Sequence, residues 1–353
     1  MIRKINMEKN IQTVTFLIGN GFDIGALSAL KSEYLTTYSQ FYKYLETHCL
    51  NKDNLIYKSI FNIKGQVADL WSKDFEEVLH DAFKKKSKSN SVKNHEINSE
   101  KIESDYNEIR VMFLEFLNIV VLPKYLIAIY GKCGTEITGY LKDFPKYSED
   151  NDISIYSDIR YNIFNFNYTT LVDNYFANYM SEFKNKLSII HPHGTYYIPK
   201  TILFGVTDVE GGHPEQYPGK GNHRLQRKRE EEVTRVIKHV DKSVDYEIKG
   251  YEKVIKGTDT FIVFGHSIGS SDKWWWKNII EQLKCGSYLL LYWFDKDIIH
   301  EENDREKKLK TFFLRNILEE REVLIEDKLF ERIEIRFFND DIPLKNIFNF
   351  KDL

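Results

Sequence analysis

Four short polar motifs in this sequence combine residue types that bind nucleotides or transfer protons. They are LIGNGFD at residues 17–23, FNFNYTT at 164–170, IIHPHGT at 189–195 and VFGHSIGSSD at 263–272. Each motif follows or closes an apolar run of strand length, so each is expected at the carboxyl end of a strand. Glycine permits close backbone approach, asparagine offers an amide, and imidazole exchanges a proton near neutral pH. Together these groups suit a ligand that carries phosphates and ribose hydroxyls.

The first motif places a glycine turn between a strand and a helix. Its spacing, Gly19-x-Gly21-x-x-x-Gly25, differs from the G-x-G-x-x-G fingerprint of dinucleotide-binding proteins, so by itself it indicates a nucleotide only weakly. The free N–H groups at the start of the helix would bind a phosphate or ribose oxygen. The alternative interpretation is a tight turn in which Asp23 caps the helix.

The second motif presents two asparagines, Asn165 and Asn167, two positions apart. Side chains with this spacing point to the same side of a strand, so both amides are expected to face one site if the strand continues that far. Capping of the strand end and turn formation are the alternative roles of such residues. Because aromatic residues surround the two asparagines, we favour a binding site.

In the third motif, His191 and His193 flank Pro192 and precede Gly194. A His-x-His pair supplies two metal ligands, but no third ligand lies at a standard spacing. We therefore predict no structural zinc and leave metal binding as the lesser alternative. We interpret His191 as a hydrogen-bonded structural residue and His193 as the residue that exchanges a proton.

The fourth motif repeats the strand–turn–helix arrangement of the first, with Gly265 and Gly269 in the turn. Its GHSIG segment fits the pattern G-x-S-x-G of serine hydrolases. In that class an acid and a histidine follow the serine, whereas the only later histidine here, His300, lies in a charged segment. We therefore favour a nucleotide contact over a serine nucleophile.

Composition limits the classes of protein that this chain can represent. It has 353 residues, 42% of them hydrophobic, which suffices for one large domain or a domain with an insertion. A net charge of −3 gives no general reason to expect nucleic acid or an anionic membrane as a partner. The three cysteines form no C-x-x-C pair, which fits a reducing compartment. With no apolar run near the roughly 18 residues that span a bilayer, and no signal-peptide pattern, we expect a cytoplasmic protein.

Apolar runs of strand length alternate with helical patterns along the chain. This alternation predicts an α/β fold with a Rossmann-like, mainly parallel sheet. Strands are expected at residues 14–18, 161–166, 187–190, 201–206, 260–264, 288–294 and 332–338. Helices are expected at 272–283, at 301–318 and at 112–129 with an interruption near Pro123. No strand pattern occurs from about residue 28 to 141, and residues 84–105 have the composition of an exposed loop. We therefore predict one domain from residues 1–27 and 155–353, with a helical insertion at 28–154.

Two further segments have a predicted placement. Residues 274–276 are three consecutive tryptophans on a predicted helix, where successive side chains diverge by about 100°, so they are not all expected in the core. Residues 207–229 are rich in glycine, histidine and arginine. We predict that they form a mobile cover over the site, with an ordinary solvated loop as the alternative.

Taken together, the motifs resemble the AbiH bacteriophage abortive-infection family. LIGNGFD, WSKDFEEVL at residues 71–79, FNYT, HPHG and FGHSIGSSD follow one another between residues 17 and 272. Their order is also distantly similar to that of the sirtuin-like NAD-binding fold, with a glycine turn, an asparagine, His-Gly and Gly-x-Ser. The resemblance implies antiphage defence, a sirtuin-like domain, and NAD as substrate or ligand.

The sirtuin-like resemblance implies roles for individual residues. Gly19 and Gly21 match the phosphate-binding turn, Asn167 matches the asparagine that positions water and ribose, and His193 matches the catalytic base. The residues expected to contact the nucleotide are Gly19, Asn20, Gly21, Phe22, Asn165, Gly194, Gly265, His266, Ser267 and Asp272.

The sequence also departs from the sirtuin-like pattern. Asp23 replaces an expected serine, and Thr169 stands where an aspartate is common. The zinc-binding cysteines of protein deacylases are absent, which argues against deacylation.

The leading hypothesis is cleavage of the nicotinamide–ribose bond of NAD through a transition state that resembles an oxocarbenium ion. Asn167 would hold water and the ribose hydroxyls, His193 would act as general base, and Asp23 or Asp272 would stabilise positive charge. The alternatives are a nucleotide-binding sensor that acts with another effector, and a metal-assisted hydrolase or nuclease. The expected partners are a nucleotide and an unknown phage trigger, and a homo-oligomer remains open.

Overall fold

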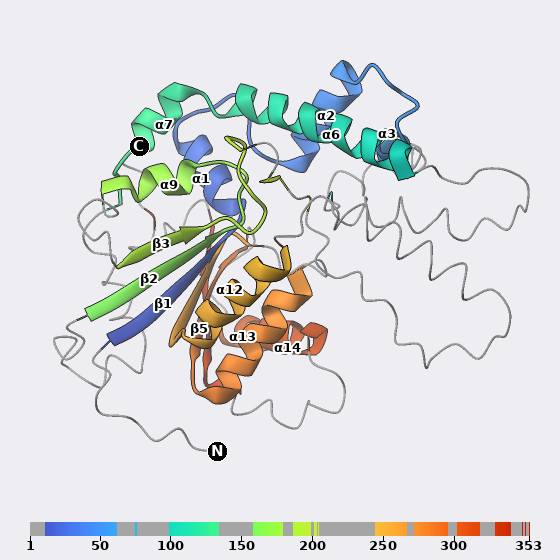
Figure 1. The fold of residues 1–353 in the computed structure, drawn as a ribbon. Coiled ribbons are helices and arrows are strands. Elements are labelled where there is room, and N and C mark those ends of the chain that lie inside the picture. The colour runs from blue at the N-terminus through green and yellow to red at the C-terminus, as the bar shows by residue number, and fades with distance from the viewer. Residues whose placement is uncertain are drawn as a thin grey trace, which may run out of the picture.

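Six parallel strands form one sheet at the centre of the molecule (Figure 1). The computed structural model describes residues 11–61, 75, 99–133, 158–178, 186–198, 201–202, 204, 244–266, 272–295, 302–317, 329–339, 348, 350 and 353. The strands are β1 (Ile11–Ile18), β2 (Asp158–Asn165), β3 (Leu187–Ile190), β4 (Thr260–Phe264), β5 (Tyr288–Phe294) and β6 (Ile333–Phe338). Their order in the sheet is β3-β2-β1-β4-β5-β6. The prediction of a Rossmann-like, parallel α/β fold is confirmed.

This order reverses direction between β1 and β4, which creates a topological switch point. β1 pairs with β2 on one side, where Ile18 is opposite Asn165, and with β4 on the other, where Ile18 is opposite Phe264. In open α/β sheets ligands bind outside the carboxyl ends of the strands at such a point. The first, second and fourth motifs therefore emerge side by side at this edge of the sheet.

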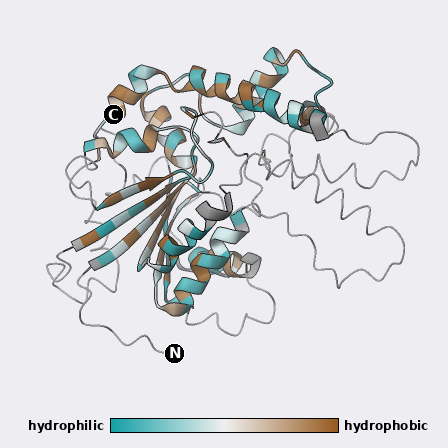
Figure 2. Ribbon diagram, viewed as in Figure 1, coloured by the Kyte–Doolittle hydropathy of each residue, from teal (hydrophilic) through white to brown (hydrophobic). Residues whose placement is uncertain are grey.

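The central strand β1 is buried on both of its faces. Val14, Phe16 and Ile18 belong to one hydrophobic core, and Leu17 belongs to a second core on the opposite face of the sheet. Figure 2 shows hydrophobic stretches along the strands and mixed colours along the helices that flank them. This two-sided burial explains why the sequence has a continuous apolar run here instead of an alternating pattern.

Helices cover both faces of the sheet (Figure 1). Helices α1 (Gly21–Ala29) and α9 (Leu171–Tyr175) pack on one face, and α12 (Val244–Lys256), α13 (Lys273–Cys285) and α14 (Glu302–Ile317) pack on the other. On α13, Trp275 and Trp276 are fully buried, whereas Trp274 is only partly buried. The prediction that the three tryptophans are not all in the core is confirmed.

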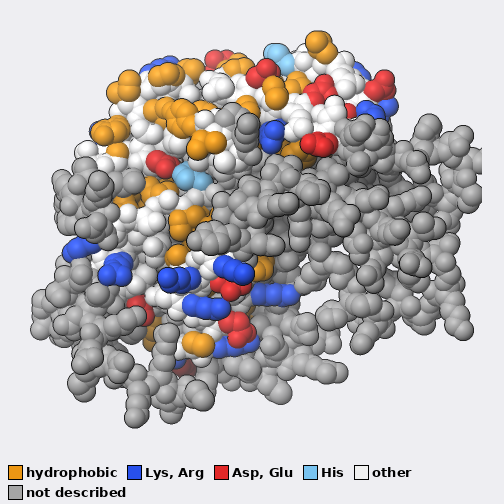
Figure 3. All heavy atoms as spheres, in the orientation of Figure 1, with side chains coloured by type: hydrophobic (Ala, Val, Ile, Leu, Met, Phe, Trp, Pro, Cys, Tyr) orange, Lys and Arg blue, Asp and Glu red, His pale blue; other side chains and the backbone are white. Residues whose placement is uncertain are grey.

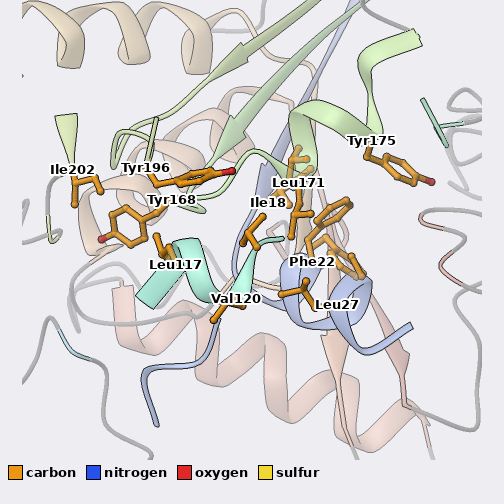
Figure 4. Close-up of a cluster of buried hydrophobic side chains, with 14 of the residues drawn as sticks. Ile18, Phe22, Leu27, Leu117, Val120, Tyr168, Leu171, Tyr175, Tyr196 and Ile202 are labelled. Carbon is orange, nitrogen blue, oxygen red and sulfur yellow. The ribbon is translucent and has the colours of Figure 1, made fainter. Parts of the chain in front are cut away.

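The segment between α1 and β2 contributes four described helices, α2 (Tyr38–His48), α3 (Leu55–Phe61), α6 (Ser99–Val120) and α7 (Pro123–Ile129). Leu117 and Val120 of α6 pack near Ile18, the last residue of β1 (Figure 4). The helical segment and the sheet thus share one hydrophobic core, and α6 lies over the carboxyl end of β1. The boundaries of the insertion stay a prediction.

Two details of the predicted helices have different outcomes. The break near Pro123 is confirmed, because α6 ends at Val120 and the proline begins α7, where its missing N–H is harmless. The predicted loop at 84–105 is wrong over residues 99–105, because α6 already begins at Ser99. Residues 84–98 lie outside the described part of the chain.

The predicted strand at residues 201–206 is wrong for its described residues. Thr201 lies in a 3₁₀ turn, and Ile202 and Phe204 are buried without strand pairing. The backbone N–H of Phe204 donates to the hydroxyl of Tyr106 on α6, at 3.2 Å, instead of to a neighbouring strand. Phe204 therefore packs against the helical insertion.

Exposed hydrophobic side chains gather over α6 and α7 on the face drawn in Figure 3. The large ones on these helices and their ends are Val111, Ile119, Leu122, Ile127 and Tyr130. Among the helices that the structure describes, none is individually long and apolar enough to cross a membrane. In this described part of the chain, the pair formed by α6 and α7 meets that criterion together, with a bend of 61° between the two helices.

Candidate functional site

The glycine turns that follow β1 and β4 pack directly against each other. The N–H of Gly19 donates to the carbonyl of Phe264, and that of Gly21 donates to the carbonyl of Gly265, both at 2.9 Å. A Cβ atom on Gly19 would lie 2.6 Å from the Gly265 carbonyl oxygen, and Gly265 itself has a φ of +61°. The glycines are therefore needed for this close contact at the switch point. Because these two N–H groups are engaged within the protein, the phosphate-binding role of Gly19 and Gly21 stays a prediction.

The two residues beside these glycines make packing contacts. Asn20 donates from Nδ2 to the Thr36 carbonyl at 2.9 Å and accepts from the Thr36 hydroxyl at 2.5 Å. Phe22 is fully buried, and its ring contacts Phe348 at 4.9 Å and Phe350 at 5.1 Å. Asn20 thus holds the loop before α2 over the turn, and Phe22 anchors α1 to residues near the carboxyl terminus of the chain.

Asp23, in the first turn of α1, is a buried carboxyl group at this edge with a raised pKa. It is 1% exposed, and its Oδ2 accepts a hydrogen bond from the Thr169 hydroxyl at 2.6 Å. Within the described residues its Oδ1 has no hydrogen-bond partner. Burial raises the pKa of Asp23 from 3.8 to about 7; the Thr169 hydrogen bond opposes this rise, and the charge of Asp173 adds to it. The group can therefore change charge near neutral pH.

Asn167, two residues after the end of β2, is buried at the same carboxyl edge of the sheet as Asp23. It is 3% exposed, and its backbone N–H donates to the Asn165 side-chain oxygen at 3.0 Å. Among the residues that the structure places, none accepts a hydrogen bond from its Nδ2. An unpaired buried amide costs about 1–3 kcal/mol, so this group is suited to a ligand that would pair with it.

The two histidines of the third motif contact different neighbours. His191 donates from Nε2 to Asp173 at 2.9 Å, which confirms its prediction as a hydrogen-bonded residue. His193 is 8% exposed and its ring lies 5.4 Å from Phe166 and 5.9 Å from Tyr168. Burial, and secondarily the charge of His266, lowers the pKa of His193 to about 4. His193 is therefore a neutral imidazole at pH 7.

Gly194, which follows His193, makes a turn that other residues cannot make. Its φ is +75°, and a Cβ atom there would lie 1.9 Å from the Thr201 carbonyl oxygen.

Within the described residues, no group of three His, Cys, Asp or Glu side chains is arranged to hold a metal ion.

The fourth motif brings His266 and Asp272 together at the end of β4. His266 Nε2 lies 3.9 Å from Asp272 Oδ2, and both side chains are buried. Burial raises the pKa of Asp272, and His266 opposes the rise. The Phe166 ring contacts His266 at 4.3 Å as well as His193, so one aromatic side chain lies between the third and fourth motifs. Ser267, residues 207–229 and most of 71–79 lie outside the described residues, so the mobile cover stays a prediction.

Tyr196 and Asp173, which lie outside the four motifs, complete the site together with Thr169 and Thr170 of the second motif. Tyr196 lies between Tyr168 and Leu171 in Figure 4, and Thr170 hydrogen-bonds with it. Asp173, on α9, links to His191, and Thr169 links to Asp23 across 146 positions of sequence. No local pattern indicates the Thr169–Asp23 pair, because that pair forms only when the sheet brings β1 and β2 together.

Asp23→Asn is expected to stabilise the protein increasingly as pH rises. Because the folded-state pKa of Asp23 is raised, the wild type loses stability between about pH 4 and pH 7, a loss corresponding to about 4 kcal/mol. Asparagine cannot ionise, and its amide oxygen still accepts from Thr169. Thermal melting at pH 5 and pH 8 measures the difference, which should be larger at pH 8. The control is Asp53→Asn, an exposed carboxylate beside Lys58; an identical gain from both substitutions at pH 8 would contradict the prediction.

Comparison with known families gives one clear finding. The family model described as "Bacteriophage abortive infection AbiH" matches residues 15–294 of this chain. The matched range runs from β1 to the end of β5 and contains all four polar motifs. No curated protein matches the sequence.

Proposed function

The chain belongs to the AbiH family of bacteriophage abortive infection proteins, and we propose that it acts in this defence by binding a nucleotide at the β1–β4 switch point and cleaving NAD. The proposed reaction is hydrolysis of the bond between nicotinamide and ribose. In this proposal NAD binds at the carboxyl ends of the strands of the Rossmann-like sheet, as in sirtuin-like domains.

The observation that carries the proposal is a pair of buried polar atoms without partners. Asp23 Oδ1 and Asn167 Nδ2 lie in the segments that follow the neighbouring strands β1 and β2, and neither has a hydrogen-bond partner in the described structure. An acceptor and a donor of this kind suit ribose hydroxyls, which both donate and accept. The neutral imidazole of His193 follows the next strand of the sheet.

In this reaction each residue would act at a stated atom. The Asn167 amide would orient the attacking water and a ribose hydroxyl. The water oxygen bonds to C1′ of the ribose as the bond from C1′ to the nicotinamide nitrogen breaks, and nicotinamide leaves with both electrons of that bond. His193 would accept the proton that the water loses and release it to solvent. Asp23 in its ionised form would stabilise the positive charge that develops on the ribose.

The positive charge of the nicotinamide ring would itself favour the ionised form of Asp23. An opposite charge within about 4–6 Å lowers the pKa of a carboxyl group. Asp23 titrates near neutral pH in the ligand-free protein. We therefore expect that binding of NAD releases a proton from Asp23 at pH 6–7.

A nucleotide-binding sensor without turnover is the second candidate, and two observations favour it. The N–H groups of Gly19 and Gly21 are engaged with carbonyls of the protein, and His193 is a weak base. Such a protein would bind NAD and act through another effector.

Incubation of the purified protein with NAD tests the proposal. Chromatography is expected to show nicotinamide and ADP-ribose appearing in equal amounts, and EDTA is expected to leave the rate unchanged. Calorimetry on the same sample measures binding. Binding without product formation would favour the sensor, and loss of activity with EDTA would favour a metal-assisted hydrolase. If the protein neither binds nor cleaves NAD, the proposal of an NAD site is rejected.

A further inference from the structure

Asn165, the last residue of β2, is the centre of a hydrogen-bond network at the carboxyl edge of the sheet. Its Oδ1 accepts from the backbone N–H of Asn167 at 3.0 Å. Its Nδ2 donates to Asp173 Oδ2 at 3.2 Å and to the carbonyl of Thr169 at 3.5 Å. One side chain thus contacts three residues of the segment that turns from β2 into α9.

The amide of Asn165 has little capacity left for a ligand. The residue is 0% exposed, and both the N–H₂ group and the oxygen are already paired within the protein. An asparagine side chain offers two donors and one acceptor oxygen, so these contacts use each polar atom. This arrangement differs from the prediction that Asn165 contacts the nucleotide, and it suggests that Asn165 acts through its neighbours.

Each neighbour of Asn165 positions a group of the proposed site. The Asn167 backbone carries the amide whose Nδ2 has no partner in the described residues. Thr169 donates from its hydroxyl to Asp23 at 2.6 Å. Asp173 accepts from His191 at 2.9 Å, and since a carboxylate can only accept, His191 carries its proton on Nε2.

We propose that Asn165 is the positioning residue of this site, holding Asn167, the Thr169–Asp23 pair and the Asp173–His191 pair in one arrangement. This inference deepens the proposed function and rests on it for the effect on catalysis. The expected effect on His191 is independent of the proposed function, because it can be measured without any substrate.

The network explains why an amide is required at this position. Aspartate has the same shape and would still accept from the Asn167 N–H. A carboxylate, however, cannot donate to Asp173 or to the Thr169 carbonyl, and its charge would repel that of Asp173. When the new carboxyl group gains a proton at lower pH, it regains one donor and the repulsion ends.

The test compares Asn165→Ala and Asn165→Asp with the control Asn162→Ala. Asn162 lies on the same strand, is half-buried, and donates to the Thr15 hydroxyl at 3.4 Å. We expect Asn165→Ala to lower the turnover number by about 100-fold, because displacements of about 1 Å have such effects, and to change the dissociation constant of NAD by less than about threefold. Relative to wild type at each pH, Asn165→Asp is expected to recover activity between pH 8 and pH 6, and Asn165→Ala is not.

A second measurement reports on the network directly. Nitrogen-15 NMR of the histidine rings distinguishes the Nε2–H from the Nδ1–H form, and His191→Gln identifies the signal of His191. We expect Asn165→Ala to reduce the Nε2–H fraction of His191 and Asn162→Ala to leave it unchanged. An unchanged His191 signal in a folded Asn165→Ala protein would overturn the inference whether or not NAD is cleaved. If the wild type does not consume NAD but the His191 signal changes as expected, the proposed reaction fails and the positioning role stands.

Loss of NAD affinity in step with loss of turnover would also overturn the inference, because Asn165 would then contact the ligand itself. Thermal melting accompanies both measurements. If Asn165→Ala does not fold, Asn165→Asp replaces it in the NMR comparison. Relative to wild type at each pH, its Nε2–H fraction of His191 is expected to be lower at pH 8 than at pH 6, and no such difference would overturn the inference.

Discussion

Gly265→Ala is expected to lower the free energy of unfolding by about 2–5 kcal/mol. The positive φ of Gly265 costs about 1–2 kcal/mol for a residue with a Cβ atom, and overpacking adds about 1–3 kcal/mol. The new Cβ would lie 2.6 Å from the Cα of Gly21, and backbone atoms on both sides leave little room to adjust. Because domains are stable by only about 5–15 kcal/mol, this loss should appear as a large decrease in the denaturant midpoint.

Gly250→Ala is the matched control for this substitution. Gly250 lies within α12, and among the described residues no atom outside its own stretch of helix lies within 4 Å of the position of its added Cβ. Alanine in a helix interior is about 0.8–1 kcal/mol more favourable than glycine, so this variant should be slightly more stable than wild type. Equal stability of the two variants would show that the contact between the glycine turns is not tight.

Removal of the His193 imidazole is expected to abolish most NAD turnover. A general base contributes typically about 10²–10⁴-fold, so His193→Ala should lower turnover by at least about 100-fold. Asn167→Ala should have an effect of similar size, because the water that His193 deprotonates would no longer be oriented. If the two residues form one catalytic unit, the double variant should be little worse than either single variant. Measurement of nicotinamide release, with calorimetry for NAD affinity, separates turnover from binding.

His191→Ala is the comparison for the His193 variant. It removes a ring that is hydrogen-bonded to Asp173, so it is expected to lower the melting temperature more than activity. His193→Ala should leave folding intact. The assignment of the base would be wrong if His193→Ala retained both full NAD turnover and full protection against phage.

The buried imidazole of His193 should also make the stability of the fold decrease at acid pH. Its folded-state pKa lies below its usual value of 6.5, so the stability that its neutral form provides is complete above pH 6.5 and is lost as pH falls towards 4. Asp23 has the opposite effect over an overlapping range, because its raised pKa favours the folded state at low pH. The pH dependence of the wild type is therefore a difference between two opposing contributions.

Local patterns were sufficient to predict the main elements of the sheet. Continuous apolar runs at residues 14–18 and 260–264 predicted strands that are buried on both faces, and these are β1 and β4. Pro123 predicted the break between α6 and α7, because a proline has a local effect on the backbone. The position of the motifs at strand ends followed from these elements alone.

Features that depend on distant contacts could not be predicted in the same way. The apolar run at 201–206 has strand composition, but Phe204 packs on the helical insertion through Tyr106. Phe22 lies within the first motif and suggested a ligand contact, whereas Phe348 and Phe350, more than 300 positions away, place it in the core. The roles of Asn165 and Thr169 likewise depend on which strands become neighbours.

The sheet order also has a consequence for synthesis of the protein on the ribosome. Gly21 is made 244 positions before Gly265, the residue whose carbonyl accepts its N–H. At about 5–20 residues per second, the first turn therefore waits roughly 12–50 seconds for its partner. During that interval the central strand lacks its β4 neighbour, and the two glycine turns cannot meet. A nascent or prematurely terminated chain thus cannot assemble the switch point, so any activity located there begins only in copies whose translation has passed the fourth motif.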